Sequence, residues 1–212
     1  MTETMLSGRG LVRWLLTLAA AMTLATSGAR AQAPAPDAFI KQLSDKVMQQ
    51  IRGDAALKAG DMRRIETFVE QTIMPHVNFE RMTALAVGRG WRDASPQQRE
   101  QLMKEFRTLL IRTYAGALQA VDDQEVRLRP LRAAPGDTDV IVRTEIVQRR
   151  GEPIQLDYRL EKTSDGWKIY DLNVLGVWLI ETYRTQFAQE ISAGGVDGLI
   201  RSLRARNEQF RR

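Results

Sequence analysis

Two pairs of adjacent residues carry the side chains best suited to acid–base chemistry. Asp157 precedes Tyr158, and Tyr170 precedes Asp171. A carboxyl group with a raised pKa in an apolar pocket, together with a phenol, is the arrangement that isomerases of the ketosteroid kind use to move a proton. One hypothesis is therefore a small-molecule isomerase that uses Asp171 and Tyr158 in an apolar pocket.

The competing interpretation of these acids is structural. Both pairs lie in segments where apolar and polar residues alternate, and neighbours in a strand point to opposite faces of the sheet. Asp157 would then point to solvent and pair with Arg143 or Arg159 across the sheet. Asp171 would accept backbone N–H bonds where its strand ends. The alternation favours this structural interpretation.

Other residues that commonly carry catalysis or bind metals are scarce. His76 is the sole histidine, and the HVNFE segment around it supplies a single acid, Glu80, which favours a structural role. The chain has no cysteine, which excludes a thiol nucleophile or a thiolate metal site. Gly88-Arg89-Gly90 follows a helical pattern, so it is interpreted as a helix C-cap and turn. The sequence therefore predicts no catalytic residue, no metal site and no cofactor.

The N-terminal segment has the layout of a secretory signal peptide. Arg9 and Arg13 flank the start of an uncharged apolar run, WLLTLAAAMTLAT, and Ala29-Arg30-Ala31 has the form of an A-x-A cleavage site. The apolar run is too short to span a bilayer. We therefore expect residues 1–31 to be removed when the protein is exported.

The mature chain is expected to consist of a flexible leader, residues 32–37, and a single domain, residues 38–210. Loss of the charges at Arg9, Arg13, Arg30 and Glu3 lowers the net charge from +5 to +3. Because this excess is mild and the protein is exported, nucleic acid is not an expected partner.

Apolar periodicity gives the expected elements around this chemistry. Helical spacing recurs in 39–51, 65–73, 79–85 and 102–117, and Ser95-Pro96-Gln97-Gln98 has the form of a capping box that begins the longest of these helices. Pro75 ends the second pattern, and Asn78 can cap the third.

The second half of the chain changes to alternating patterns. Alternation is found in 126–128, 140–148 and 154–160, and a hairpin turn at 163–166 leads into Trp167. Helical spacing returns from Val177 to Gly194-Gly195, and Asp197 begins a last helix. This order predicts an α+β fold in which helices pack on a twisted antiparallel sheet of about four strands.

Large apolar side chains are abundant on this frame, and two interpretations remain open. They fill a close-packed core, or helices and sheet leave an apolar cavity for a lipid-like ligand.

Several segments, taken in order and spacing, carry a resemblance to a known family. They are PHVNFERMTALAVGRGW (75–91), SPQQREQLMKEFRTLLIRTYAGAL (95–118), LDYRLEK (156–162), GWKIYDLNVLGVWLIETYRTQF (166–187) and GVDGLI (195–200). The chain resembles the MlaC family, also called toluene-tolerance auxiliary proteins. These are periplasmic phospholipid-binding proteins of the lipid-asymmetry pathway.

The resemblance implies a lipid carrier rather than an enzyme. A phospholipid would be bound with its acyl chains in an apolar pocket between helices and sheet. The implied partners are an outer-membrane lipoprotein–porin complex and an inner-membrane ABC transporter complex. Similar proteins of hopanoid pathways leave a hopanoid or sterol-like lipid as an alternative ligand. The sequence shows no surplus apolar stripe that would demand a dimer, so a monomer is expected.

The residues expected to line the lipid pocket come from the long helix, two strands and the segment around Asp171. They are Phe106, Leu110, Tyr114, Val140, Val142, Ile146, Leu156, Tyr158, Leu160, Ile169, Val174 and Trp178. Ile169 and Val174 can share a wall only if a β-bulge lies near Asp171.

One segment departs from the family pattern. After the aspartate, the family commonly reads Val-x-Gly-Val-Ser with an acid at the variable place. Here Leu175 precedes Gly176, and Trp178 stands in place of the serine. We expect the bulky ring of Trp178 to reshape the mouth of the pocket. Arg184, in the Tyr-Arg-x-x-Phe segment, is interpreted as structural.

Overall fold

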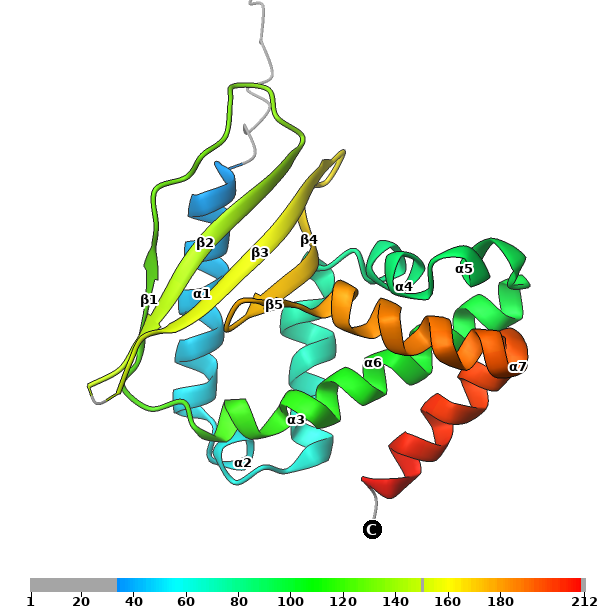
Figure 1. Ribbon diagram of the computed structural model, residues 1–212. Coiled ribbons are helices and arrows are strands. Elements are labelled where there is room, and N and C mark those ends of the chain that lie inside the picture. The colour runs from blue at the N-terminus through cyan, green and yellow to red at the C-terminus, as the bar shows by residue number, and fades with distance from the viewer. Residues whose placement is uncertain (1–33, 150, 211–212) are drawn as a thin grey trace, which may run out of the picture. The chain divides into compact units, whose positions relative to one another are not determined.

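The computed structural model of the protein describes residues 34–149 and 151–210 (Figure 1). The predicted signal peptide lies outside the described residues. The first helix begins at Pro36, so the end of the predicted leader is already helical. The described residues cluster as one compact unit.

The helices occupy both ends of the described part of the chain, as the apolar periodicity predicts. The α-helices are α1 (Pro36–Gly53), α2 (Ala55–Lys58), α3 (Met62–Phe68), α4 (Phe79–Val87), α5 (Arg89–Asp93), α6 (Pro96–Gln119) and α7 (Leu179–Gln209). A π-helical segment η1 (Val69–Ile73) and a 3-10 turn η2 (Met74–His76) follow α3. Pro75 offers no N–H to the helical ladder, so the regular helix does not continue through it.

Helix ends are fixed by the caps that the sequence predicts. The Ser95 hydroxyl accepts the N–H of Gln98 at 3.2 Å, and the Gln98 side chain accepts the N–H of Ser95 at 2.9 Å, which completes the capping box. Asn78 accepts the N–H of Arg81 at the start of α4. The turn predicted after Gly88 is instead the short helix α5.

Helix α7 contains the predicted break at its glycine pair. Gly195 has φ 65° and ψ −167°, which are not helical values, so α7 consists of two helical pieces joined by a kink. A side chain at this position would be strained because φ is positive.

The sheet is an antiparallel meander in the order β1-β2-β3-β4-β5. Its strands are β1 (Glu125–Leu128), β2 (Asp139–Val147), β3 (Ile154–Thr163), β4 (Gly166–Val174) and β5 (Val177–Trp178). The predicted combination of helices and antiparallel sheet is confirmed, with five strands rather than about four. The fifth strand was missed because two residues are too few to show an alternating pattern.

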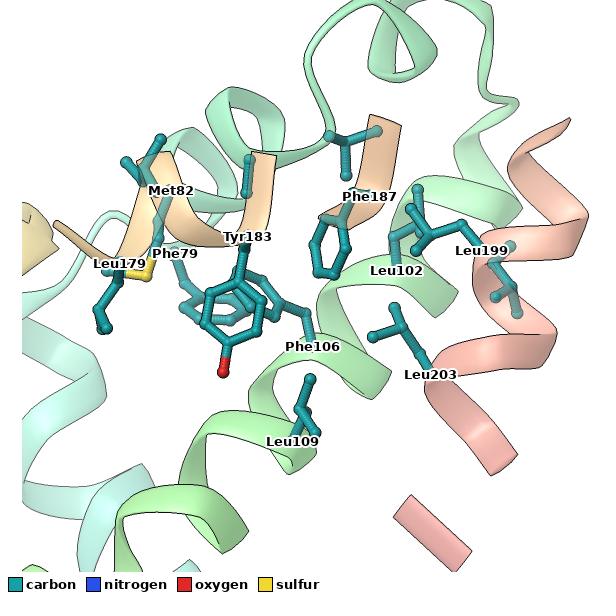
Figure 2. Packing of buried hydrophobic residues seen from close by; sticks show 14 of the residues in the cluster. Phe79, Met82, Leu102, Phe106, Leu109, Leu179, Tyr183, Phe187, Leu199 and Leu203 are labelled. Atoms are coloured by element: carbon teal, nitrogen blue, oxygen red, sulfur yellow. The ribbon is translucent and has the colours of Figure 1, made fainter. Parts of the chain in front are cut away.

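Three clusters of buried apolar side chains hold these elements together. The helical cluster joins α4, α6 and α7 around Phe106, Tyr183 and Phe187 (Figure 2). The sheet cluster joins α1 to one face of the sheet through Ile40 and Leu43. The third, the α3 cluster, joins the end of α1 to α2, α3 and α6. The sheet face that packs on α1 is called the α1 face below.

Candidate functional site

Most of the predicted strand residues share the α1 face. In the register of β2 and β3, Val140 pairs with Leu160 and Val142 with Tyr158. Paired residues in an antiparallel sheet point to the same side, and positions two apart do so as well. Ile146 and Leu156 therefore also lie on the α1 face, where both are half-buried.

A β-bulge in β4 brings two further predicted residues to this face. Arg159 pairs with Asp171 and Leu160 with Ile169, which leaves Tyr170 as the extra residue. The bulge reverses the alternation, so Ile169 and Val174 both point to the α1 face. From the sequence, these two residues could share a wall of the pocket only if a β-bulge lay near Asp171. The structure contains this bulge.

The predicted residues of α6 lie in another part of the molecule. Phe106 is buried at the centre of the helical cluster (Figure 2). Leu110 is half-buried and packs against that cluster. Tyr114 is 37% exposed. The structure thus places Phe106 and Leu110 with the helical cluster, whereas six of the predicted strand residues belong to or pack against the sheet cluster: Val140, Val142, Leu156, Tyr158, Leu160 and Ile169.

Half-buried apolar side chains connect the three clusters. Val77 and Leu172 pack against both the helical and the sheet clusters, and Val47 packs against both the sheet and α3 clusters. On α6, Leu110 packs against the helical cluster and Ile111 against the α3 cluster. We call these five residues the junction.

The junction is apolar and comes from four different parts of the chain. A domain usually has one contiguous core, whereas here half-buried side chains link three cores. Apart from Leu110, sequence reasoning missed these residues. Helical spacing placed Val47 on the apolar face of α1. Leu172 lies on the α1 face with its register partner Tyr158 and with Val174.

Tyr158 has a structural role between α1 and the sheet. Its side chain is buried in the sheet cluster together with Ile40 and Leu43 of α1. Burial raises the pKa of Tyr158 to about 12, so the phenol stays neutral at physiological pH.

Asp171 lies on the opposite face of the sheet from Tyr158. It is fully buried and accepts the N–H groups of Leu172 at 2.9 Å and Ile180 at 3.1 Å. Arg159 donates to its other carboxylate oxygen at 2.9 Å. Burial raises the pKa of Asp171, while these three donors oppose the rise.

This geometry agrees with the predicted structural role of Asp171, but β4 continues beyond it to Val174, so its strand does not end there as predicted. The isomerase hypothesis needs Asp171 and Tyr158 in one pocket. The register places them on opposite sides of the sheet, because Asp171 pairs with Arg159, the residue after Tyr158.

The prediction that Asp157 points to solvent is wrong. Asp157 is 4% exposed. Its carboxylate accepts hydrogen bonds from the side-chain amide of Gln155 at 2.6 Å and from the backbone N–H of Thr144 at 3.3 Å. Its register neighbour Asn173 is equally buried. Asp157 lies on β3, between β2 and β4, and its carboxylate is satisfied by these donors within the sheet rather than by solvent.

Trp178 is separated from the other predicted strand residues. It pairs with Asn173, so its side chain lies on the face opposite to α1. There the Arg159 guanidinium stacks over its ring at 4.0 Å, and Arg159 also reaches Glu181 at 3.4 Å. Trp178 therefore covers the ion pair of Arg159 and Asp171.

The remaining polar candidates make structural contacts. The His76 ring packs edge-on against Phe39 with centroids 5.7 Å apart, and burial lowers its pKa, helped by the charges of Lys46 and Lys168. Arg184 donates to the carbonyl of Leu85 at 2.9 Å.

Two further features bear on the class of site. Across residues 34–149 and 151–210, no three histidine, aspartate or glutamate side chains are close enough together to hold a metal ion. Nor does any helix of this described part have the length and apolar character to cross a membrane.

Fold and site together define an α+β protein whose distinctive feature is an apolar junction between a helix-covered sheet and a helical layer. The chain belongs to the MlaC family, since the family model described as MlaC protein matches residues 41–205. The resemblance seen in the sequence segments is thereby confirmed.

Named relatives agree with this membership. The chain is 27% identical over 198 residues to the intermembrane phospholipid transport system binding protein MlaC of Haemophilus influenzae, a match that covers 91% of this chain and 92% of the relative. It is 26% identical over 106 residues to the toluene tolerance protein ttg2D of Pseudomonas putida, covering 50% of this chain and 49% of that protein.

A solved structure is more similar still. The phospholipid-binding protein from Ralstonia solanacearum, determined in complex with a phospholipid, is 46% identical to this chain with a TM-score of 0.82. The match covers 84% of this chain and 100% of that protein.

Proposed function

We propose that this protein is a periplasmic carrier that binds a phospholipid and shields its acyl chains from water. The observation that carries the proposal is the similarity, at 46% identity and over the whole of that chain, to a protein solved with a phospholipid bound. Membership of the MlaC family supports shuttling between an outer-membrane lipoprotein–porin complex and an inner-membrane ABC transporter complex.

The physical need for such a carrier is large. Moving acyl chains into water costs roughly 0.8 kcal/mol for each CH₂ group. Free diffusion of a two-chain lipid between membranes is therefore negligible, and an apolar protein site must replace the bilayer.

The junction is the place that we propose for the acyl chains. Its side chains are aliphatic and half-buried, and they lie where three apolar clusters adjoin rather than at the centre of one close-packed core. On the sheet side, the predicted residues Ile146, Leu156 and Val174 extend this apolar surface along the α1 face. Such a site needs apolar walls and no catalytic residues, which supports a carrier rather than an enzyme.

Mass spectrometry of lipid extracted from the protein, purified after export, tests the proposal. We expect phospholipid in roughly stoichiometric amount. A hopanoid or sterol in its place would change the ligand, and no lipid across gentle preparations would overturn the carrier function.

A pair of variants tests the location. Leu110→Trp adds bulk at the junction and should lower the lipid content. Leu85→Trp adds the same bulk where α4 packs on the helical cluster, outside the junction, and should leave the lipid content unchanged. Unfolding curves of both variants show whether either result reflects lost stability. Equal lipid content in the two folded variants would contradict this placement.

A further inference from the structure

The turn between β4 and β5 is strained at an apolar residue. Leu175 and Gly176 connect the paired residues Val174 and Val177, with φ of 53° and 88°. Positive φ at both central positions is that of a type I′ hairpin turn, where Asn, Asp or Gly are favoured. Leu175 is the sole residue other than glycine with positive φ in the described part of the chain.

This strained residue is also exposed to water. Leu175 is 67% exposed and Val177 is 55% exposed. Asparagine at position 175 would suit both the backbone and the solvent better, so neither folding nor solubility accounts for leucine there. Strain combined with apolar exposure points to a binding role. We call Leu175, Gly176 and Val177 the hairpin tip.

The hairpin tip continues the apolar surface proposed for the acyl chains. Val177 pairs with Val174, and Val174 pairs with Leu156, so all three side chains point to the α1 face. Exposure increases along this row, from half-buried Leu156 to Val177 at the edge of the sheet. A lipid leaving the junction along this face would reach the hairpin tip.

We propose that the hairpin tip inserts into the acyl region of a phospholipid bilayer and guides lipid between the bilayer and the site. The inference rests on the proposed carrier function. The size of the tip favours a lipid surface over a protein partner, since a stable protein interface needs about 800 Å² on each side. Shallow insertion into a bilayer needs no matching surface, and residues from Asn173 to Trp178 carry no charge that would oppose it.

Trp178 provides a reporter of insertion next to the hairpin tip. Vesicles of phosphatidylcholine with brominated acyl chains quench tryptophan fluorescence at contact distance. We expect them to quench the wild-type protein and not Trp178→Phe, because Trp167 is buried in the sheet cluster and Trp91, on α5, packs against the helical cluster beneath the Arg99 guanidinium. Wild-type protein that the vesicles do not quench would overturn the proposal.

Leu175→Asn separates the binding role from folding. Asparagine tolerates positive φ, so this variant should unfold at the same or a higher denaturant concentration. We expect its affinity for the vesicles to fall by about tenfold, as for loss of one buried leucine. Phe210→Gln removes an apolar side chain that is 52% exposed at the end of α7 and serves as the control.

The outcomes distinguish the alternatives. Equal loss of vesicle binding in Leu175→Asn and Phe210→Gln would show general apolar adhesion and overturn the proposal. Lipid transfer can also be compared with vesicles that do and do not contain membrane proteins. If Leu175→Asn slows transfer only when membrane proteins are present, the hairpin tip binds a protein partner and the proposal is overturned. Lipid content of the purified protein tests the carrier function separately, because Leu175→Asn should still contain phospholipid.

Discussion

The carboxylate of Asp171 accepts the backbone N–H of Ile180 at 3.1 Å and thereby caps helix α7 from a neighbouring strand. The residue at the N-cap position of α7, Trp178, makes no side-chain capping bond. The buried acid thus supplies an acceptor that is normally provided by the N-cap side chain itself. This contact accounts for a buried aspartate without any catalytic role.

Removal of the Asp171 carboxylate should destabilise the fold strongly. Asp171→Ala leaves Arg159 without its buried partner and two N–H groups without an acceptor, for a cost of about 3–5 kcal/mol in the free energy of unfolding. Asp171→Asn keeps an acceptor and should lose about 1–3 kcal/mol. Urea unfolding measures both. An alanine variant as stable as the wild type would contradict the capping role.

Trp178 should affect stability but not lipid content. Its ring stacks on Arg159 on the face opposite to α1, so Trp178→Ala removes a cation–π contact worth about 0.5–2 kcal/mol. The acyl chains are proposed to lie on the other face, so lipid extracted from the variant should match the wild type. A large loss of bound lipid in a folded Trp178→Ala protein would instead support the sequence-based expectation that this residue lies at the mouth of the pocket.

Local signals made much of this fold predictable. The Ser95–Gln98 capping box, the Gly195 break and the alternating strands each specify structure within a few residues, so the sequence alone indicates them. The sheet face of Ile169 was left conditional because a single extra residue, Tyr170, reverses the alternation beyond it. Strand β5 and the burial of Asp157 depend on packing between distant segments, and no local pattern encodes that packing.

The candidate site was less predictable than the fold for the same reason. Sequence reasoning could identify apolar residues on α6 and on the strands. It could not show that Phe106 belongs to the helical cluster while Val142 belongs to the sheet cluster. Nor could it find the junction, since Val47, Val77 and Leu172 come from distant parts of the chain and pack against the same cluster only in the folded protein.

The capping box of α6 should contribute measurably to stability. Ser95→Ala removes the acceptor for the N–H of Gln98 and should cost about 1 kcal/mol in the free energy of unfolding. Ser192→Ala is a matched control, because Ser192 is exposed in α7 and alanine favours helix. Urea titrations should show a loss in the first variant and no loss in the second. Equal midpoints for the two variants would rule out a stabilising cap.

Alkaline pH should destabilise the protein through its buried tyrosines. The pKa values of Tyr158 and Tyr170 are raised from 10.0 to about 12, chiefly by burial. Between these values the folded state retains protons that the unfolded state has released, so the free energy of unfolding falls as pH rises through this window.

Tyr158→Phe isolates one of these two contributions. The variant keeps the buried ring that packs with α1 and removes the phenol hydroxyl that titrates in this window. Its decline in stability between pH 10 and 12 should be shallower than in the wild type, by up to about 2 kcal/mol. Urea unfolding across this range, together with the near-ultraviolet absorbance of the phenolates, measures the effect. If Tyr158 ionises near pH 10 while the protein remains folded, the buried contact between α1 and the sheet is not formed as described.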